Sequence, residues 1–263
     1  MKPPKIDWSV LESATGDASR IGDWLDDLGS TRAPTRKRAM QQLSAALCSQ
    51  GVVNEASLAA VPFLFAALSR RGMRDRDAIV NLLVGIAVGD HGRFLDGSGT
   101  PRARALGRSG KARSIEGQCY QHVHARLDVL RELIGASDAK VRASAAFALA
   151  WFPDPDGHGA TRLLARATVE RDELVEASIA ITLGHLGVAD ARPILRELLI
   201  ARSKLLRTAA AIGLAYMDPK DKLDDIRGTL GDALGDLERT RLPWNRGDLG
   251  KHADTVLAAL QRR

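Results

Sequence analysis

The sequence predicts an all-α fold, a right-handed superhelix of about six stacked helix pairs. One sequence unit occurs three times within residues 130–219, starting at Leu130, Leu164 and Leu195, so that the starts lie 34 and then 31 residues apart. Repeats of this length are typical of helix pairs that stack, because a single pair cannot bury its own apolar face. We therefore expect each unit to contribute one pair to a continuous core.

Each unit is expected to contain two helices, because its apolar residues recur at intervals of three and four. In the first unit Leu127, Leu130 and Leu133 mark the first helix, and Val141 begins the second stripe. The apolar stripes are accompanied by small residues that allow neighbouring helices to approach closely. These small residues are Ala145, Ala146, Ala148, Ala180, Gly184, Ala209, Ala210 and Gly213.

Polar residues mark the predicted starts of the second helices. Asp138, Asp172 and Ser203 each lie a few residues before an apolar stripe. Their side chains accept hydrogen bonds from the unpaired amides of a helix start, so we expect them to be N-caps.

The preceding sequence is expected to contain two more repeats. Residues 1–18 are predicted to be a poorly ordered lead or an N-terminal cap. A diverged first repeat follows, in which Trp24 lies 11 residues before Thr35, as Leu130 lies 11 before Val141. The second repeat occupies residues 55–86, and Pro62 is expected to bend its first helix.

Residues 91–117 interrupt the pattern and are predicted to be a basic insertion, either mobile or a binding loop. The 27 residues carry six basic and two acidic side chains and have no apolar period. Gln118 restarts the pattern, and a looser pair at residues 223–260 ends it, with the linker 241–250 between its two stripes. Residues 1–263 are therefore expected to form a single solenoid domain.

Composition limits the classes of protein to which the chain can belong. Apolar residues make up 45% of the 263, enough for a large core, and the two cysteines are too few for a disulfide framework. The first residues contain no apolar run that resembles a signal peptide or a membrane span, so we expect a cytoplasmic protein without membrane association. The formal charge of +6 permits an acidic partner.

The sequence Asp138-Ala-Lys-Val141-Arg142, followed by an alanine-rich stripe, resembles HEAT repeats. Residues 48–68 and 241–249 extend the resemblance to a group of bacterial HEAT-repeat proteins. This resemblance implies an armadillo-type α-solenoid. It does not imply one function, since the architecture hosts scaffolds, inhibitors, bilin lyase subunits and DNA alkylpurine glycosylases.

Arginines provide the first candidate binding residues. Arg142 and Arg207 occupy one position of the repeat, where Glu176 replaces them in the middle unit. They are expected either to line an anion-binding groove or to bond adjacent repeats. The basic insertion offers a second set, which would contact phosphates or remain solvated. This set comprises Arg102, Arg104, Arg108 and Lys111.

Trp151 is the remaining candidate residue, because with Asp154 it is the nearest approach to a carboxylate framed by aromatic rings. Packing between repeats is the alternative role for Trp151, and Trp244 is expected to cap the last repeat. Cys119, His122 and His124 form the one metal-like cluster, but His124 would point away from the other two. We therefore predict no catalytic residue, metal or cofactor.

The leading hypothesis is a non-enzymatic scaffold or regulatory, immunity-type module that binds a protein on the concave surface formed by the second helices. The alternative is a nucleic-acid-binding protein related in fold to the DNA alkylpurine glycosylases, with the basic insertion as its contact.

Overall fold

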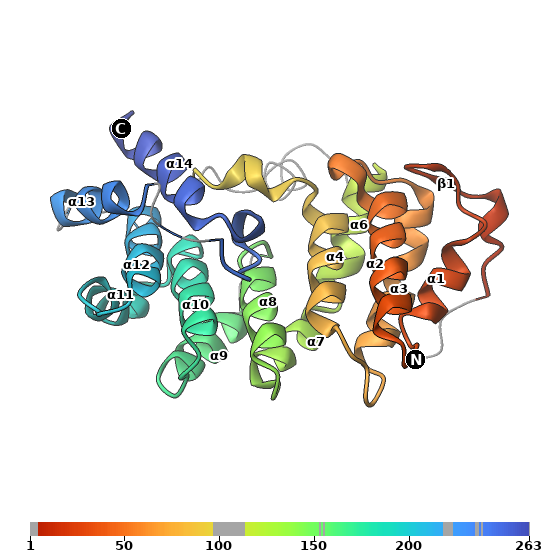
Figure 1. Ribbon diagram of the computed structural model, residues 1–263, viewed down its shortest axis with the longest axis horizontal. Helices are drawn as coiled ribbons and strands as arrows, with labels where there is room; N and C mark the ends of the chain where they lie inside the picture. Colours follow the sequence, from red (N-terminus) through yellow and green to blue (C-terminus); the bar gives the residue numbers. More distant parts are fainter. Residues whose placement is uncertain are drawn as a thin grey trace. The chain divides into compact units, whose positions relative to one another are not determined.

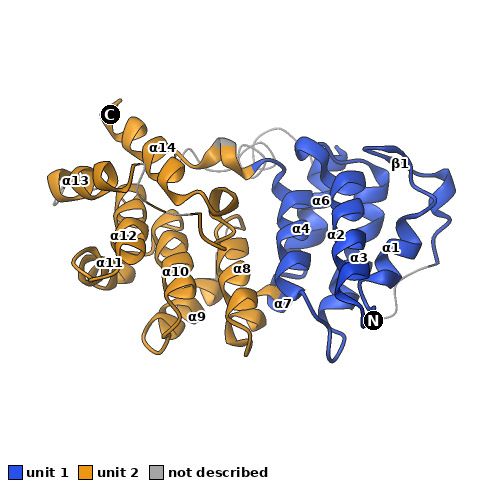
Figure 2. Cartoon of the chain, in the orientation of Figure 1, with its two compact units in different colours: residues 1–90, 100–129 blue, residues 91–99, 130–263 orange. Residues whose placement is uncertain are grey.

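A computed structural model describes residues 5–96, 114–152, 154, 156–217, 223–234, 237 and 239–262. The chain divides into two compact units, which we call unit 1 (residues 1–90 and 100–129) and unit 2 (residues 91–99 and 130–263) (Figure 2). Throughout the described residues the fold is helical apart from one short antiparallel hairpin, in which Glu12–Ser13 (β1) pairs with Gly16–Asp17 (β2). The predicted all-α class is confirmed.

The described residues of unit 1 form two helix pairs and one further helix (Figure 1). Helix α1 packs on α2, α3 packs on α4, and α6 lies against both α3 and α4. Its elements are η1 (Trp8–Val10), α1 (Ile21–Asp27), α2 (Ala33–Cys48), η2 (Ser49–Gly51), α3 (Glu55–Leu68), α4 (Arg76–Val88) and α6 (Ile115–His124).

The N-terminal residues are packed against the helices of unit 1. The Trp8 ring lies 5.4 Å from that of Phe63 in α3, and the Ala14 N–H donates to the Ala46 carbonyl of α2 at 2.9 Å. Of the two alternatives for this lead, the geometry of residues 5–18 therefore agrees with a cap.

Unit 2 contains the regular repeats, whose second helices α8, α10 and α12 lie side by side (Figure 1). Helix α7, the first element of these repeats, spans the boundary between the units. The elements are η3 (His91–Phe94), α7 (Leu127–Glu132), η5 (Leu133–Gly135), α8 (Ala139–Leu149), α9 (His158–Ala167), α10 (Glu173–His185), η6 (Ala189–Ala191), α11 (Arg192–Leu199), α12 (Lys204–Tyr216), α13 (Leu223–Ala233), η7 (Trp244–Gly247) and α14 (Leu249–Gln261).

The three predicted N-caps are confirmed. Asp138 accepts from the Lys140 amide at 2.8 Å, and Asp172 accepts from two amides at the start of α10. Ser203 accepts from the Leu206 amide at 3.5 Å. Each cap therefore satisfies one or two of the unpaired N–H groups of its second helix.

Helices α10 and α12 touch through their glycines, as the sequence predicts. A Cβ atom on Gly184 would lie 2.2 Å from the Cα atom and carbonyl oxygen of Gly213, and one on Gly213 would lie 2.7 Å from the Ala180 carbonyl oxygen. Two backbones this close leave no room for a side chain between them, so both positions require glycine.

No helix within the described part of the chain is long and apolar enough to cross a membrane.

The Gly184→Ala substitution should destabilise the protein by about 3 kcal/mol, because the new methyl group overlaps the α12 backbone, which has no side chain to rotate away. Urea unfolding followed by circular dichroism measures the change. Gly228→Ala in α13 is the control. It meets no atom within 4 Å, so it should stabilise the helix by roughly 0.5–1 kcal/mol. Equal stability of the two variants would contradict the close contact between α10 and α12.

Candidate functional site

One arginine position recurs in three repeats and closes the turn between the two helices of each pair. Arg142 Nη1 donates to the carbonyl oxygens of residues 136 and 137, both at 2.9 Å. Arg207 Nη1 makes the same two bonds with residues 201 and 202, and Arg36 Nη1 makes them with residues 30 and 31. The arginine thus binds carbonyl groups five and six residues earlier in the chain.

Arg142 also joins its repeat to the next through Glu170, which is 2% exposed. The Nε and Nη2 atoms of Arg142 donate to the two carboxylate oxygens of Glu170 at 2.8 and 2.9 Å. Arg166 Nε donates to the same carboxylate at 2.7 Å. Burial alone would raise the pKa of Glu170. Hydrogen bonds from both arginines and from the amides of Arg171 and Asp172 instead hold this pKa well below its usual range. The geometry of Arg142 is thus the inter-repeat bond that the sequence offered as one alternative.

The remaining basic candidates, Arg102, Arg104, Arg108 and Lys111, lie outside the described residues.

Trp151 is 1% exposed and belongs to an aromatic cluster in unit 2. Its ring centroid lies 4.9 Å from His185, 5.6 Å from Trp244 and 5.7 Å from Phe147. The ring therefore packs between α8, α10 and the segment before α14, which agrees with the packing alternative.

The segment that leads into α14 covers the same region. Trp244 is fully buried, and its Nε1 donates to Ser178 Oγ of α10 at 3.2 Å. Its ring lies 5.1 Å from Phe147 of α8, and the segment runs over α10 toward α8 (Figure 1). Trp244 thus inserts between second helices well before the last pair, and not only over the last repeat, where the sequence analysis expected it.

The turn that carries Trp244 is strained. Asn245, Arg246 and Gly247 all have positive φ angles, of 46°, 56° and 85°. The turn is closed by the Thr240 N–H, which donates to the Gly247 carbonyl at 2.9 Å. A left-handed arginine costs about 1–2 kcal/mol, so burial of Trp244 must offset it.

The second helices of unit 2 are almost entirely buried. Every residue of α8 from 141 to 149 is buried, as are residues 177–184 of α10 and 208–215 of α12. The segment that carries Trp244 therefore covers the second helices α8 and α10 around Phe147 and Ser178, and partner binding on the concave surface stays a prediction.

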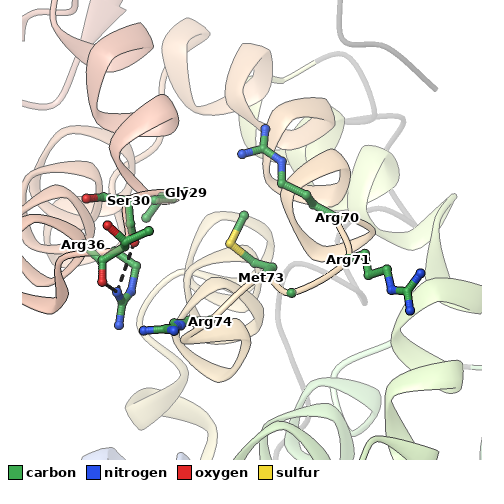
Figure 3. A pocket seen from close by; sticks show the side chains of 10 residues that line it. Gly29, Ser30, Arg36, Arg70, Arg71, Met73 and Arg74 are labelled. Carbon is green, nitrogen blue, oxygen red and sulfur yellow. Dashed lines mark hydrogen bonds between the residues drawn. The ribbon is translucent and has the colours of Figure 1, made fainter.

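A polar recess of about 200 Å³ lies in unit 1 between two loops, α1–α2 and α3–α4. Figure 3 shows Arg74 directed toward Arg36, with Met73 between these residues and Arg70. The lining residues are Leu28, Gly29, Ser30, Thr31, Arg36, Arg70, Arg71, Gly72, Met73 and Arg74. We call this site the arginine recess.

Positive charge dominates the arginine recess. Arg36 Nε donates to Asp75 Oδ2 at 2.6 Å, and Arg36 is 8% exposed at its side chain. The side chains of Arg70, Arg71 and Arg74 have no ion-pair or hydrogen-bond partner in the described part of the chain. Guanidinium groups without acidic partners bind carboxylates and phosphates through charged hydrogen bonds.

Metal-binding groups are not gathered among the residues described: no three His, Cys, Asp or Glu side chains there are arranged to hold an ion. Cys119 is buried, and His124 stacks on Tyr120 with centroids 6.0 Å apart.

Comparison with known proteins agrees with the repeat architecture. Residues 127–215 match the family model of HEAT repeats, which covers α7 to α12. A crystal structure described as an engineered protein, from the Northeast Structural Genomics Consortium, is similar over 92% of this chain and 96% of its own, with 18% identity and a TM-score of 0.51. It supports the fold alone. No curated protein matches the chain. The HEAT-repeat resemblance is thus confirmed for residues 127–215, and the bacterial grouping stays a prediction.

The arginine recess is not among the candidate sites predicted from the sequence. Arg36 follows Thr35 as Arg142 follows Val141, so the repeat register contains the signal for its structural role. Arg70 and Arg74 belong to a loop, and their position beside Arg36 depends on how α2 packs against α3 and α4.

Glu170→Ala should destabilise the protein by roughly 3 kcal/mol or more, because it leaves the Arg142 guanidinium buried without its carboxylate. Chemical unfolding at pH 7 measures the loss. Glu197→Ala, which removes an exposed carboxylate from α11, is the matched control and should change stability by less than about 0.5 kcal/mol. A cost for Glu170→Ala as small as that of the control would contradict the inter-repeat role of Glu170.

Stability should fall as the pH is lowered from about 6.5 to 4.5. Burial lowers the pKa of His185 to about 4 and that of His252 to about 3, so the unfolded chain takes up protons first. Each histidine that stays neutral in the folded state then lowers the free energy of unfolding by roughly 1 kcal/mol per pH unit. Thermal melting across this range should show a shallower slope for His252→Gln than for the wild type. The exposed His122→Gln control should keep the wild-type slope, and an unchanged slope in His252→Gln would contradict the assignment.

Proposed function

We propose that this protein is a non-catalytic scaffold that binds an acidic segment of a protein partner at the arginine recess of unit 1. The observation that carries the proposal is the set of exposed arginines without acidic partners, Arg70, Arg71 and Arg74, around a recess in a helical-repeat framework. Complementary charge attracts and orients a partner, and arginine is enriched where proteins meet.

The state of unit 2 supports this choice of surface. Its second helices α8 and α10 pack against the buried Trp244, so a partner that bound at this point would first have to displace the tryptophan. In unit 1, by contrast, α2 retains an exposed polar face with Lys37, Arg38, Gln41 and Gln42. A partner can therefore approach unit 1 without any rearrangement.

Nucleic acid is the alternative partner, and its case depends on the basic insertion at residues 91–117. Sequence-independent binding to nucleic acid needs phosphate contacts repeated along a strand, commonly with aromatic rings for stacking. The arginine recess has no aromatic residue in its lining. A protein partner is therefore the better supported class.

The double substitution Arg70→Glu with Arg74→Glu should abolish capture of the partner, because it places two acidic groups where the acidic segment docks. The full chain is used for affinity purification from the cells that produce it, with and without nuclease, and captured proteins are quantified by mass spectrometry. We expect a nuclease-resistant polypeptide that the wild type retains and the double variant loses.

Arg162→Glu with Arg202→Glu is the control, since it makes the same change in charge at exposed sites of unit 2. It should retain the partner. Equal capture by both double variants would contradict the proposed surface, and loss of every captured protein upon nuclease treatment would favour nucleic acid instead.

A further inference from the structure

We infer that the arginine recess binds a phosphorylated side chain in the partner segment. This inference rests on the proposed function, because it names the chemical group that the partner presents. Three features of the recess support this inference: the unbalanced charge of its lining, one arginine that is already held in place, and a volume that suits a single phosphate group.

The charge of the lining is unbalanced. Four arginines line the recess, and neither an aspartate nor a glutamate is among the lining residues. Asp75 reaches Arg36 from just beyond the lining and uses one carboxylate oxygen to do so. Even when Asp75 is counted, the residues at the recess carry four positive charges and one negative charge. An anion in the recess would relieve the repulsion between neighbouring guanidinium groups.

Arg36 is positioned before any ligand arrives. Its Nη1 is fixed by the carbonyls of Ser30 and Thr31 at 3.1 and 3.2 Å, and its Nε is fixed by Asp75. Nη2 has no acceptor among the described residues. A buried guanidinium held in this way loses little conformational freedom when it donates to a ligand, so more of the interaction free energy contributes to affinity.

Two further arginines of the lining lie on the α3–α4 loop. Arg74 is directed toward Arg36 (Figure 3), and Arg70 lies against Gly29, where a Cβ atom would be 2.6 Å from its Nη1. Gly29 therefore leaves the space that the Arg70 guanidinium occupies at the edge of the recess. Three guanidinium groups, one from α2 and two from the α3–α4 loop, can in this way contribute to one site.

A phosphate ester matches this site better than a carboxylate does. A phosphorylated side chain carries a charge of about −2 at neutral pH and three acceptor oxygens, so it can accept from several guanidinium groups at once. A carboxylate carries one charge and two oxygens. A volume of about 200 Å³ admits the phosphate group with water around it, but is too confined for a duplex.

Fluorescence polarisation with three forms of one labelled peptide tests the inference. The peptide Gly-Glu-Glu-X-Glu-Glu-Gly carries phosphoserine, serine or glutamate at X, and is titrated with the full chain. We expect the phosphoserine form to bind at least about tenfold more tightly than the other two, because charged hydrogen bonds are the stronger ones. Inorganic phosphate should compete with it.

Arg74→Ala should weaken binding of the phosphoserine peptide by about tenfold or more. The matched control is Arg38→Ala, which removes an exposed arginine of α2 that does not line the recess, and it should change the affinity less than about twofold. Circular dichroism melting verifies that both variants are folded; both side chains are exposed, so we expect wild-type melting.

The possible failures are distinguishable. Equal binding of all three peptides that still depends on Arg74 would overturn the phosphate inference and leave the acidic-partner proposal standing. Binding that Arg74→Ala does not affect, or preference for a duplex DNA competitor over the phosphoserine peptide, would also overturn the inference. If no peptide binds, the inference is wrong, and the partner-capture experiment with the double variants decides the proposed function separately.

Discussion

In three of the repeats, hydrogen bonds from one arginine side chain to two carbonyl groups of the preceding turn fix the geometry of the helix pair. Arg36, Arg142 and Arg207 each make this pair of bonds five and six residues back along the chain. A turn between two helices leaves carbonyl groups without helical partners, and burying them unpaired is costly. The arginine satisfies them and at the same time sets where the second helix begins relative to the first.

The same residue links one repeat to the next when an acidic group is within reach. Glu170 meets Arg142 in unit 2, and Asp75 meets Arg36 in unit 1, in both cases from the loop that precedes the next second helix. The two sites differ in burial, since the Glu170 side chain is 2% exposed and that of Asp75 is 55% exposed. In unit 2 the Arg142 side chain has only structural partners, whereas in unit 1 one edge of the Arg36 guanidinium faces a recess that is open to ligands.

Sequence reasoning succeeded where the determining interactions are local. The N-caps Asp138, Asp172 and Ser203 bond amides two or three residues away, and the contact of Gly184 with Gly213 follows from residues that recur within the repeat. Periodic positions therefore predict these features without knowledge of the rest of the fold.

The candidate site and the cover over unit 2 could not be predicted in this way. Arg70 and Arg74 come near Arg36 because α2 packs on α3 and α4, and no periodicity places loop residues. Trp244 donates a hydrogen bond to Ser178, which lies 66 residues earlier in the chain. The three residues that follow Trp244 have left-handed backbone conformations. Arg142 and Arg207 stand out in the sequence because they share one position of the repeat, and Trp151 stands out because Asp154 follows it. Arg142 and Trp151 are buried, Arg142 in a bonding role and Trp151 in a packing role.

The position of Trp244 has a consequence for biosynthesis. A ribosome makes α8, α10 and α12 before it makes Trp244, so these helices can assemble while the apolar rings of Phe147 and Trp151 still lack the indole that will cover them. Nascent chains with uncovered aromatic surface are the species that chaperones bind and that associate with one another. Unit 2 therefore completes its core only after translation has passed the strained turn.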